Sequence, residues 1–326
     1  MSSHKSGGAA HVVLTAILVN ALVTITKAVG WLISLSPSML AEAIHSLADT
    51  VNQSLVYMGI RISKKGPTRE FPMGYGQARY LWNLISATGI FFIGFGITTY
   101  HGVSSLFGDH HSQGSFLMVI SILGFAFIAE GYALLVAYKD VYSQKGDLSL
   151  FQWIKEGDDP TTVGILIEDF IAVLGVILAA VGIVLTYLYH NPIFDSIASI
   201  IIGFLLGVMA ITMGYANGRL LINRAISVSS ENEIKNFLLS LPEINSISSL
   251  KTEIISPEVI SLSVDFSINS DTINQDPQLA EEISKNDMNL DELKVTVKMI
   301  GQFINSIENK VYKQFPEIKY IDLEIN

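Results

Sequence analysis

The chain has 326 residues; half are hydrophobic, only 15% are charged, and the net charge is −10 at neutral pH. Ordinary soluble domains carry roughly 25% charged residues, so a chain of this composition either sits in lipid or buries an unusual share of itself. The lack of cysteine excludes disulfides, thiolate metal sites and cysteine nucleophiles. The acidic balance argues against a nucleic-acid partner, which requires clustered Lys and Arg.

The charge is divided unevenly along the chain. Residues 1–224 hold 12 Lys and Arg against 13 Asp and Glu, whereas residues 225–326 hold 8 against 17. Nearly all of the acidity therefore belongs to the last third, and two regions of different composition join near Arg219–Arg224. We predict a transmembrane domain in residues 1–218 and a cytosolic domain in residues 219–326.

Six apolar segments of the first region are about 20 residues or longer, the length needed to cross roughly 30 Å of hydrocarbon. They are Val12–Leu35, Leu40–Ile60, Tyr80–Phe107, Phe116–Tyr138, Val163–Tyr189 and Pro192–Tyr215. Soluble domains do not normally contain six such helices in succession. The sequence therefore predicts an all-α, six-helix transmembrane bundle.

Basic residues mark two of the connections between these spans. The loop after the second span carries Arg61, Lys64, Lys65, Arg69 and Arg79, and the loop after the fourth carries Lys139, Lys145 and Lys155. The other three connections contain no Lys or Arg. Because positively charged loops stay on the cytoplasmic side, both termini are expected in the cytoplasm. We expect an integral membrane protein of the bacterial cell (inner) membrane.

The last third has the alternation and helical periodicity of a soluble domain. We predict a helix beginning near Ser229, strands at Ile247–Ile255 and Val259–Ile268, a helix at Asp291–Phe315 and a strand at Ile318–Ile325. The order α-β-β-α-β indicates a small α+β, ferredoxin-like domain. A short helix in residues 146–160 and a polar loop in residues 270–289 are also expected.

Several ionisable residues lie within the predicted spans, where each costs roughly 2.5–3.5 kcal/mol at the helix centre. Among them are Lys27, Glu42, His45, Asp49, Glu130, Glu168 and Asp169. A purely structural anchor would not need them, so they are the first candidates for function.

His45 and Asp49 are four residues apart and therefore project from one face of a helix. At about 1.5 Å per residue, Asp49 lies roughly 14 Å along the second span, and Glu168 and Asp169 lie roughly 8–9 Å along the fifth. Helix tilt and a shift of a few residues at the helix ends let both groups reach a common layer. An imidazole with two or three carboxylates suits a divalent cation such as Zn²⁺, with Mn²⁺, Co²⁺ or Fe²⁺ as alternatives. A packing role for His45 is the competing interpretation, and the second acidic cluster favours a shared metal site.

The remaining polar residues of the spans have simpler interpretations. Lys27 is expected to snorkel or to pair with Glu42, and we favour a structural role. Glu130 is expected either to support the metal ligands or to bond a neighbouring helix, and the sequence leaves both open. The Gly203–Gly207 segment is typical of a close contact between helices. The outer-loop histidines, His110 and His111, are expected to be solvated.

Three stretches resemble the cation diffusion facilitator (zinc transporter) family. Ala41–Asp49 is similar to the second-helix metal motif, in which a His or Asp precedes an Asp by four residues. Pro72–Tyr80 resembles the glycine-bearing loop that enters the third helix. Glu168–Val176 resembles the fifth-helix motif, in which the ligand Asp is followed six residues later by Gly. The resemblance covers nearly the whole chain and is strongest to the mitochondrial and bacterial branch related to zinc transporter 9.

The resemblance implies a homodimer, joined by the cytosolic domain, with a mid-membrane metal site in each protomer. It places His45, Asp49 and Asp169 on ligand positions. The family's fourth ligand falls on Ile165, which cannot bind metal, so Glu168 is expected to complete the shell directly or through water. The resemblance also implies that the family's accessory zinc sites are absent here, since Phe71 and Tyr75 stand where histidines would be expected and the tail contains no histidine.

The expected function is efflux of a divalent metal, by exchange of Zn²⁺ for protons through alternating access. No cofactor is expected other than the transported metal. An exporter of Mn²⁺, Co²⁺ or Fe²⁺ in the same family is one alternative. A membrane metal sensor or a metalloenzyme is another, although no HExxH-type motif is present and we predict that the chain is not an enzyme.

Overall fold

The computed structural model describes residues 6–108, 116–144, 160–269 and 290–326. The chain divides into two compact units, Met1–Leu221 and Ile222–Asn326. The histidines expected in the outer loop, the short helix expected in residues 146–160 and the loop expected in residues 270–289 lie outside the described residues.

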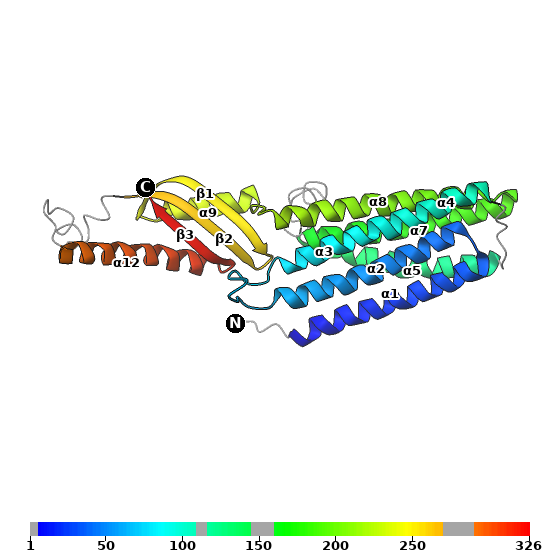
Figure 1. Ribbon diagram of the computed structural model, residues 1–326, viewed down its shortest axis with the longest axis horizontal. Helices are drawn as coiled ribbons and strands as arrows, with labels where there is room; N and C mark the ends of the chain where they lie inside the picture. Colours follow the sequence, from blue (N-terminus) through cyan, green and yellow to red (C-terminus); the bar gives the residue numbers. More distant parts are fainter. Residues whose placement is uncertain (1–5, 109–115, 145–159, 270–289) are drawn as a thin grey trace. The chain divides into compact units, whose positions relative to one another are not determined.

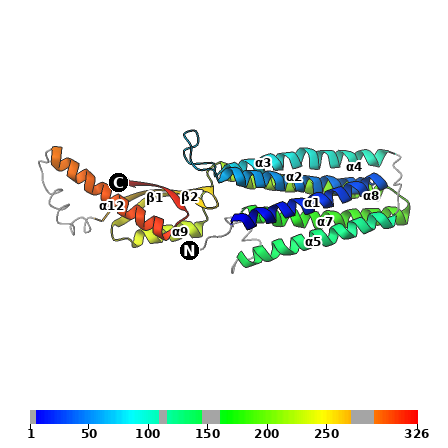
Figure 2. The ribbon, with the colours of Figure 1, turned by 90° about the horizontal axis from the view of Figure 1, so that it is seen from below.

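The first unit is a bundle of long helices that run alongside one another (Figure 1, Figure 2). The helices are α1 (Ser6–Ser34), α2 (Pro37–Ser63), α3 (Ala78–Gly89), η1 (Ile90–Ile97), α4 (Thr98–Phe107), α5 (Phe116–Gln144), α7 (Pro160–Tyr189) and α8 (Ile193–Leu221). The η1 segment is a π-helix, and α3, η1 and α4 follow one another without a break as a single rod. Each predicted span corresponds to one of these rods, with ends that differ by up to six residues.

Helix α2 is at the centre of this arrangement. It packs against α1, α3, α7 and α8, whereas α5 packs against α1 and α7. Ser36 caps its start by accepting a hydrogen bond from the backbone N–H of Met39, and Pro37 occupies the first turn. Most side chains of α2 therefore face another helix, and only a few lie on the surface of the bundle.

The outer surface of the bundle exposes large apolar side chains, as is typical of a surface that faces lipid. Phe92, Ile128 and Ile211 are 69%, 72% and 62% exposed. Among the described residues, five helical segments are long and apolar enough to cross a membrane: Ile17–Ser34, Ala78–Phe107, Phe116–Ser143, Val163–Tyr189 and Ile193–Leu221. Helix α2 has 27 residues, more than the roughly 20 that a span requires, but its polar side chains keep it out of this set.

Two glycines of α8 let the rod formed by α3, η1 and α4 approach closely. A Cβ at Gly203 would lie 2.5 Å from Oγ1 of Thr99, and one at Gly207 would lie 3.1 Å from the ring of Phe95. Small residues at such crossings allow helix backbones to pack tightly in lipid. The close helix contact predicted for the Gly203–Gly207 segment is confirmed.

The second unit contains α9 (Val228–Ser240), β1 (Ile244–Ser256), β2 (Val259–Ile268), α12 (Leu290–Gln314) and β3 (Ile318–Ile325). The sheet order is β1-β2-β3, with β1 antiparallel and β3 parallel to β2. Alternate residues of β2 (Leu262, Val264 and Phe266) are fully buried, and Ile307 and Val311 of α12 are buried as well. The predicted order of elements is confirmed, and β1 begins three residues earlier than expected.

Candidate metal centre

One face of α2 carries the polar residues of the bundle interior. Its buried polar side chains include Glu42, His45, Asp49 and Asn52, spaced three or four residues apart, while Leu47 and Val51 of the opposite face are about half exposed. This periodicity places polar groups inside and apolar groups outside. A helix with its apolar face outward is suited to a lipid surround. The polar face of α2 is directed toward α1 and α7.

His45 and Asp49 form the first half of the candidate site. Nε2 of His45 lies 3.4 Å from Oδ2 of Asp49, and the two residues are 1% and 8% exposed. Among the described residues, neither imidazole nitrogen of His45 nor Oδ1 of Asp49 has a hydrogen-bond partner. Leaving a buried polar atom unsatisfied costs about 1–3 kcal/mol. These atoms are therefore available to a ligand, and their chemistry suits a divalent metal.

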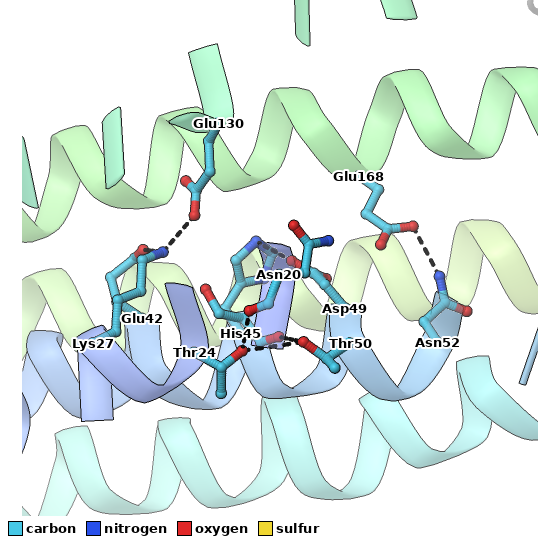
Figure 3. Close-up of polar contacts among 11 residues, drawn as sticks. Asn20, Thr24, Lys27, Glu42, His45, Asp49, Thr50, Asn52, Glu130 and Glu168 are labelled. Atoms are coloured by element: carbon cyan, nitrogen blue, oxygen red, sulfur yellow. Dashed lines mark hydrogen bonds and ion pairs between the residues drawn. The ribbon is translucent and has the colours of Figure 1, made fainter. Parts of the chain in front are cut away.

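Glu168 of α7 contributes the second half and is held from α2. Asn52 donates its Nδ2 hydrogen to Oε2 of Glu168 at 2.8 Å (Figure 3). Glu168 is 6% exposed, and its other oxygen, Oε1, has no partner in the described part of the chain. Asp169 is half-buried beside it. Ile165, at the position of the missing fourth ligand, is 48% exposed and faces away from the interior.

The two halves are electrostatic neighbours but do not converge on a single point. The carboxylate of Asp49 interacts electrostatically with those of Glu168 and Asp169. No group of three His, Asp or Glu side chains among the described residues is close enough to hold a metal ion. The structure therefore brings His45 to Asp49, Glu168 to Asn52 and the carboxyl groups of Asp49 and Glu168 close to each other, but it does not gather three of the four candidate ligands around one point.

A second charged cluster lies one helical turn away. Nζ of Lys27 in α1 is 2.6 Å from Oε2 of Glu42 in α2 and 2.6 Å from Oε1 of Glu130 in α5 (Figure 3). Lys27 and Glu42 are fully buried. The predicted pairing of Lys27 with Glu42 is confirmed, and Glu130 is found to join them. We call these three residues the ion triad.

Gly175 of α7 makes room for the ion triad. A Cβ at Gly175 would lie 2.4 Å from Oε1 of Glu42. The carboxylate of Glu42 is fully buried and is held by Lys27 through its other oxygen, so moving it aside would disturb that ion pair. The glycine six residues after Asp169 thus has a physical reason, because only a residue without a side chain lets α7 approach this carboxylate.

Sequence reasoning did not find two further polar contacts. Ser86 of α3 donates to Oδ1 of Asn52 at 2.7 Å, which extends the support of Glu168 to a third helix. Asp195, in the first turn of α8, accepts hydrogen bonds from the backbone and the hydroxyl of Ser38 near the start of α2. An acid in a first helical turn is a common signal, and it does not reveal a partner 157 residues away.

Comparison with known proteins identifies the family. Residues 13–222 match the model of the cation efflux transmembrane domain. This chain belongs to the cation efflux family. It is 31% identical over 334 residues to a mouse protein named proton-coupled zinc antiporter SLC30A9, mitochondrial, covering 98% of this chain and 59% of that protein. This confirms the predicted family, the cation diffusion facilitators.

Two other relatives of this cation efflux protein match different shares of the chain. Metal tolerance protein C4 of Arabidopsis thaliana is 31% identical over 332 residues, covering 96% of this chain and 72% of the plant protein. Magnetosome protein MamM of Paramagnetospirillum magneticum is 32% identical over 103 residues, about a third of each chain. The chain spans about three fifths of the length of the mouse relative. The matching family model and the name of the mouse relative both describe a transporter, in agreement with the prediction that the chain is not an enzyme.

Proposed function

We propose that this cation efflux protein exports Zn²⁺ across its membrane in exchange for protons, with the substrate site between α2 and α7. The observation that carries the proposal is the buried His45–Asp49 pair, whose unpartnered ligand atoms share the bundle interior with Glu168 of α7. The mouse relative's name, proton-coupled zinc antiporter, supports the choice of substrate and coupling ion.

The proposed ligands are His45, Asp49, Glu168 and Asp169. One imidazole nitrogen and carboxylate oxygens form an accepted zinc donor set. Because the donors belong to two helices and do not converge in this conformation, movement of α7 relative to α2 would assemble the site in one state and disperse it in another. Alternating access requires such a change in a bistable element.

Proton coupling follows from the chemistry of these ligands. Imidazole and carboxylate bind metal only when deprotonated, so protons and Zn²⁺ compete for the same atoms. Lowering the pH should therefore weaken apparent Zn²⁺ affinity, by up to about tenfold per pH unit for each proton displaced. Isothermal titration of the purified protein at several pH values measures this slope, and an affinity independent of pH would contradict proton exchange at the site.

The placement of the protein in its membrane is also part of the proposal. Helix α2 is taken as a membrane span in addition to the five apolar ones, which gives six in total. Both termini then face the cytoplasm, and the second unit joins two copies as a homodimer. The basic loops at residues 61–79 and 139–155 support the orientation. We propose the bacterial cell membrane as its location, whereas the mouse relative is named as mitochondrial.

Transport by proteoliposomes tests the function. The reconstituted chain, given a proton gradient, should move Zn²⁺ faster than Mn²⁺, Co²⁺ or Fe²⁺, and Asp49→Ala or Asp169→Ala should abolish that flux. Asp140→Ala, which removes an exposed carboxylate of α5, should leave it unchanged. Unimpaired flux in both site variants would contradict the site, and binding without flux in the unaltered protein would indicate a metal sensor.

A specific observation favours one alternative substrate. The proposed ligand set contains one nitrogen and otherwise oxygens, which softens the preference for Zn²⁺ over harder ions such as Mn²⁺. In the same proteoliposomes, a flux of Mn²⁺ exceeding that of Zn²⁺ at equal concentration would establish a manganese exporter of the same family. Both results would leave the location of the site intact.

A further inference from the structure

Three side chains from three helices form a buried hydrogen-bonded chain. The Ser86 hydroxyl of α3 donates to Oδ1 of Asn52 at 2.7 Å, and Nδ2 of Asn52 donates to Oε2 of Glu168 at 2.8 Å. Ser86 and Asn52 are each 3% exposed, and Glu168 is 6% exposed. Figure 3 shows the side chains of Asn52 and Glu168 directed at each other across the gap between α2 and α7.

The chain has a fixed direction. An amide nitrogen only donates and an ionised carboxylate only accepts, so Glu168 orients the Asn52 amide with its nitrogen toward it, and the Ser86 hydroxyl donates to the amide oxygen on the other side. The reverse orientation would set the amide oxygen against a carboxylate oxygen, two acceptors without a proton between them. Asn52 therefore occupies Oε2 of Glu168 and leaves Oε1, which has no partner in the described part of the chain.

We propose that Asn52, held in place by Ser86, is a positioning residue that restricts Glu168 to one metal-binding oxygen and thereby favours Zn²⁺ over ions of higher coordination number. The inference rests on the proposed function, in which Glu168 is a ligand. A carboxylate that binds through one oxygen supplies one of the four donors of a tetrahedral Zn²⁺ site. A carboxylate free to bind through both oxygens adds a donor, as suits the six-coordinate, oxygen-rich sites of Mn²⁺.

Metal binding by the purified full chain in detergent tests this role, with ZnCl₂ and MnCl₂ as separate titrants. Asn52→Ala should lower Zn²⁺ affinity about 10–100-fold, the usual effect of removing a partner of a ligand, and should lower Mn²⁺ affinity less. Ser86→Ala should act in the same direction and more weakly. Ser54→Ala, which removes a hydroxyl bonded to the α2 backbone on the exposed side, should change neither affinity.

Bound Co²⁺ provides a readout that general loss of structure would not imitate. Tetrahedral Co²⁺ absorbs visible light far more strongly than six-coordinate Co²⁺. The Asn52→Ala protein saturated with Co²⁺ should therefore show weaker visible absorption than the unaltered protein. An unchanged spectrum together with an unchanged ratio of Zn²⁺ to Mn²⁺ affinity would overturn the inference.

A double-mutant cycle shows whether Asn52 acts through Glu168. Once Glu168 is replaced by Ala, Asn52→Ala should have no further effect on Zn²⁺ affinity. Equal effects with and without Glu168 would overturn the inference and leave zinc transport standing. Failure of the unaltered protein to bind or move any of the metals would instead overturn the proposed function. If Asn52→Ala does not fold, the same cycle with Ser86→Ala decides the question.

Discussion

The two charged clusters on the inner face of α2 are one helical turn apart and differ in whether they contain a cation of their own. In the ion triad, an ammonium lies 2.6 Å from each of two carboxylates, so each charge has a partner of opposite sign. In the His45–Asp49 pair, both imidazole nitrogens and one carboxylate oxygen have no hydrogen-bond partner in the described part of the chain. One cluster supplies its own cation, and the other lacks one.

This difference separates a structural role for the ion triad from a metal-binding role for the His45–Asp49 pair. A lysine tied to its helix cannot leave, so the ion triad holds α1, α2 and α5 together but carries nothing across the membrane. A cluster with empty ligand atoms gains stability from a cation that arrives and departs. Mutations in the two clusters should therefore affect different measurements, although the residues share one helix face.

The largest expected effect is on metal binding by the His45–Asp49 pair. Asp49→Asn keeps the size of the side chain and removes the charge, so Zn²⁺ affinity should fall more than about 100-fold, beyond the effect of removing an outer partner. The melting temperature of the metal-free protein should change little, because no hydrogen bond to Oδ1 is lost. Isothermal titration and thermal unfolding in detergent measure the two quantities, and a large fall in melting temperature with unchanged affinity would reverse our assignment.

The next largest effect is on stability through the ion triad. Lys27→Met leaves Glu42 and Glu130 buried without a cation, and breaking a buried pair in this way costs about 3–5 kcal/mol. Thermal unfolding should show a clear loss. The triple variant Lys27→Met, Glu42→Gln and Glu130→Gln removes all three charges and should recover most of it. A Lys27→Met protein as stable as the original would show that the ion triad contributes nothing.

A substitution at Gly175 of α7 tests the packing of the ion triad. Gly175→Ala places a methyl group 2.4 Å from the present position of Oε1 of Glu42 and should destabilise the protein by about 1–3 kcal/mol, the usual cost of overpacking. Gly164→Ala on the same helix is the matched control, since its Cβ would meet nothing within 4 Å, and higher helix propensity should make it neutral or stabilising. Equal melting temperatures for the two variants would contradict the close approach at Gly175.

Local sequence patterns predicted much of this structure. The bounds of β2 and β3 and the positions of the helical rods follow from hydrophobic periodicity, which acts over a few residues. The shared face of His45 and Asp49 follows from the helical repeat alone. Each of these features depends only on residues that are close together in the sequence, so each can be predicted without knowing which helices pack together.

The contacts that complete the interior could not be predicted in this way. Glu130 bonds Lys27 across 103 residues, and Asn52 bonds Glu168 across 116. Both depend on which helices are neighbours and on how each is rotated, and periodicity specifies neither. The sequence consequently identified the candidate metal ligands and Lys27 but left Glu130 unassigned, missed Asp195 and gave Ser86 no role.

The smallest expected effect belongs to a charge pair in the second unit. Lys310 of α12 bonds Glu243, and the two side chains are 38% and 12% exposed. Water and salt weaken such a pair to about 0.2–1 kcal/mol, well below the cost of breaking the ion triad. Lys310→Gln should therefore lower the melting temperature only slightly more than Lys313→Gln, which removes an equal charge from an exposed position of the same helix. The difference should vanish in high salt. A loss as large as that of Lys27→Met would show that solvent exposure does not separate the two kinds of ion pair.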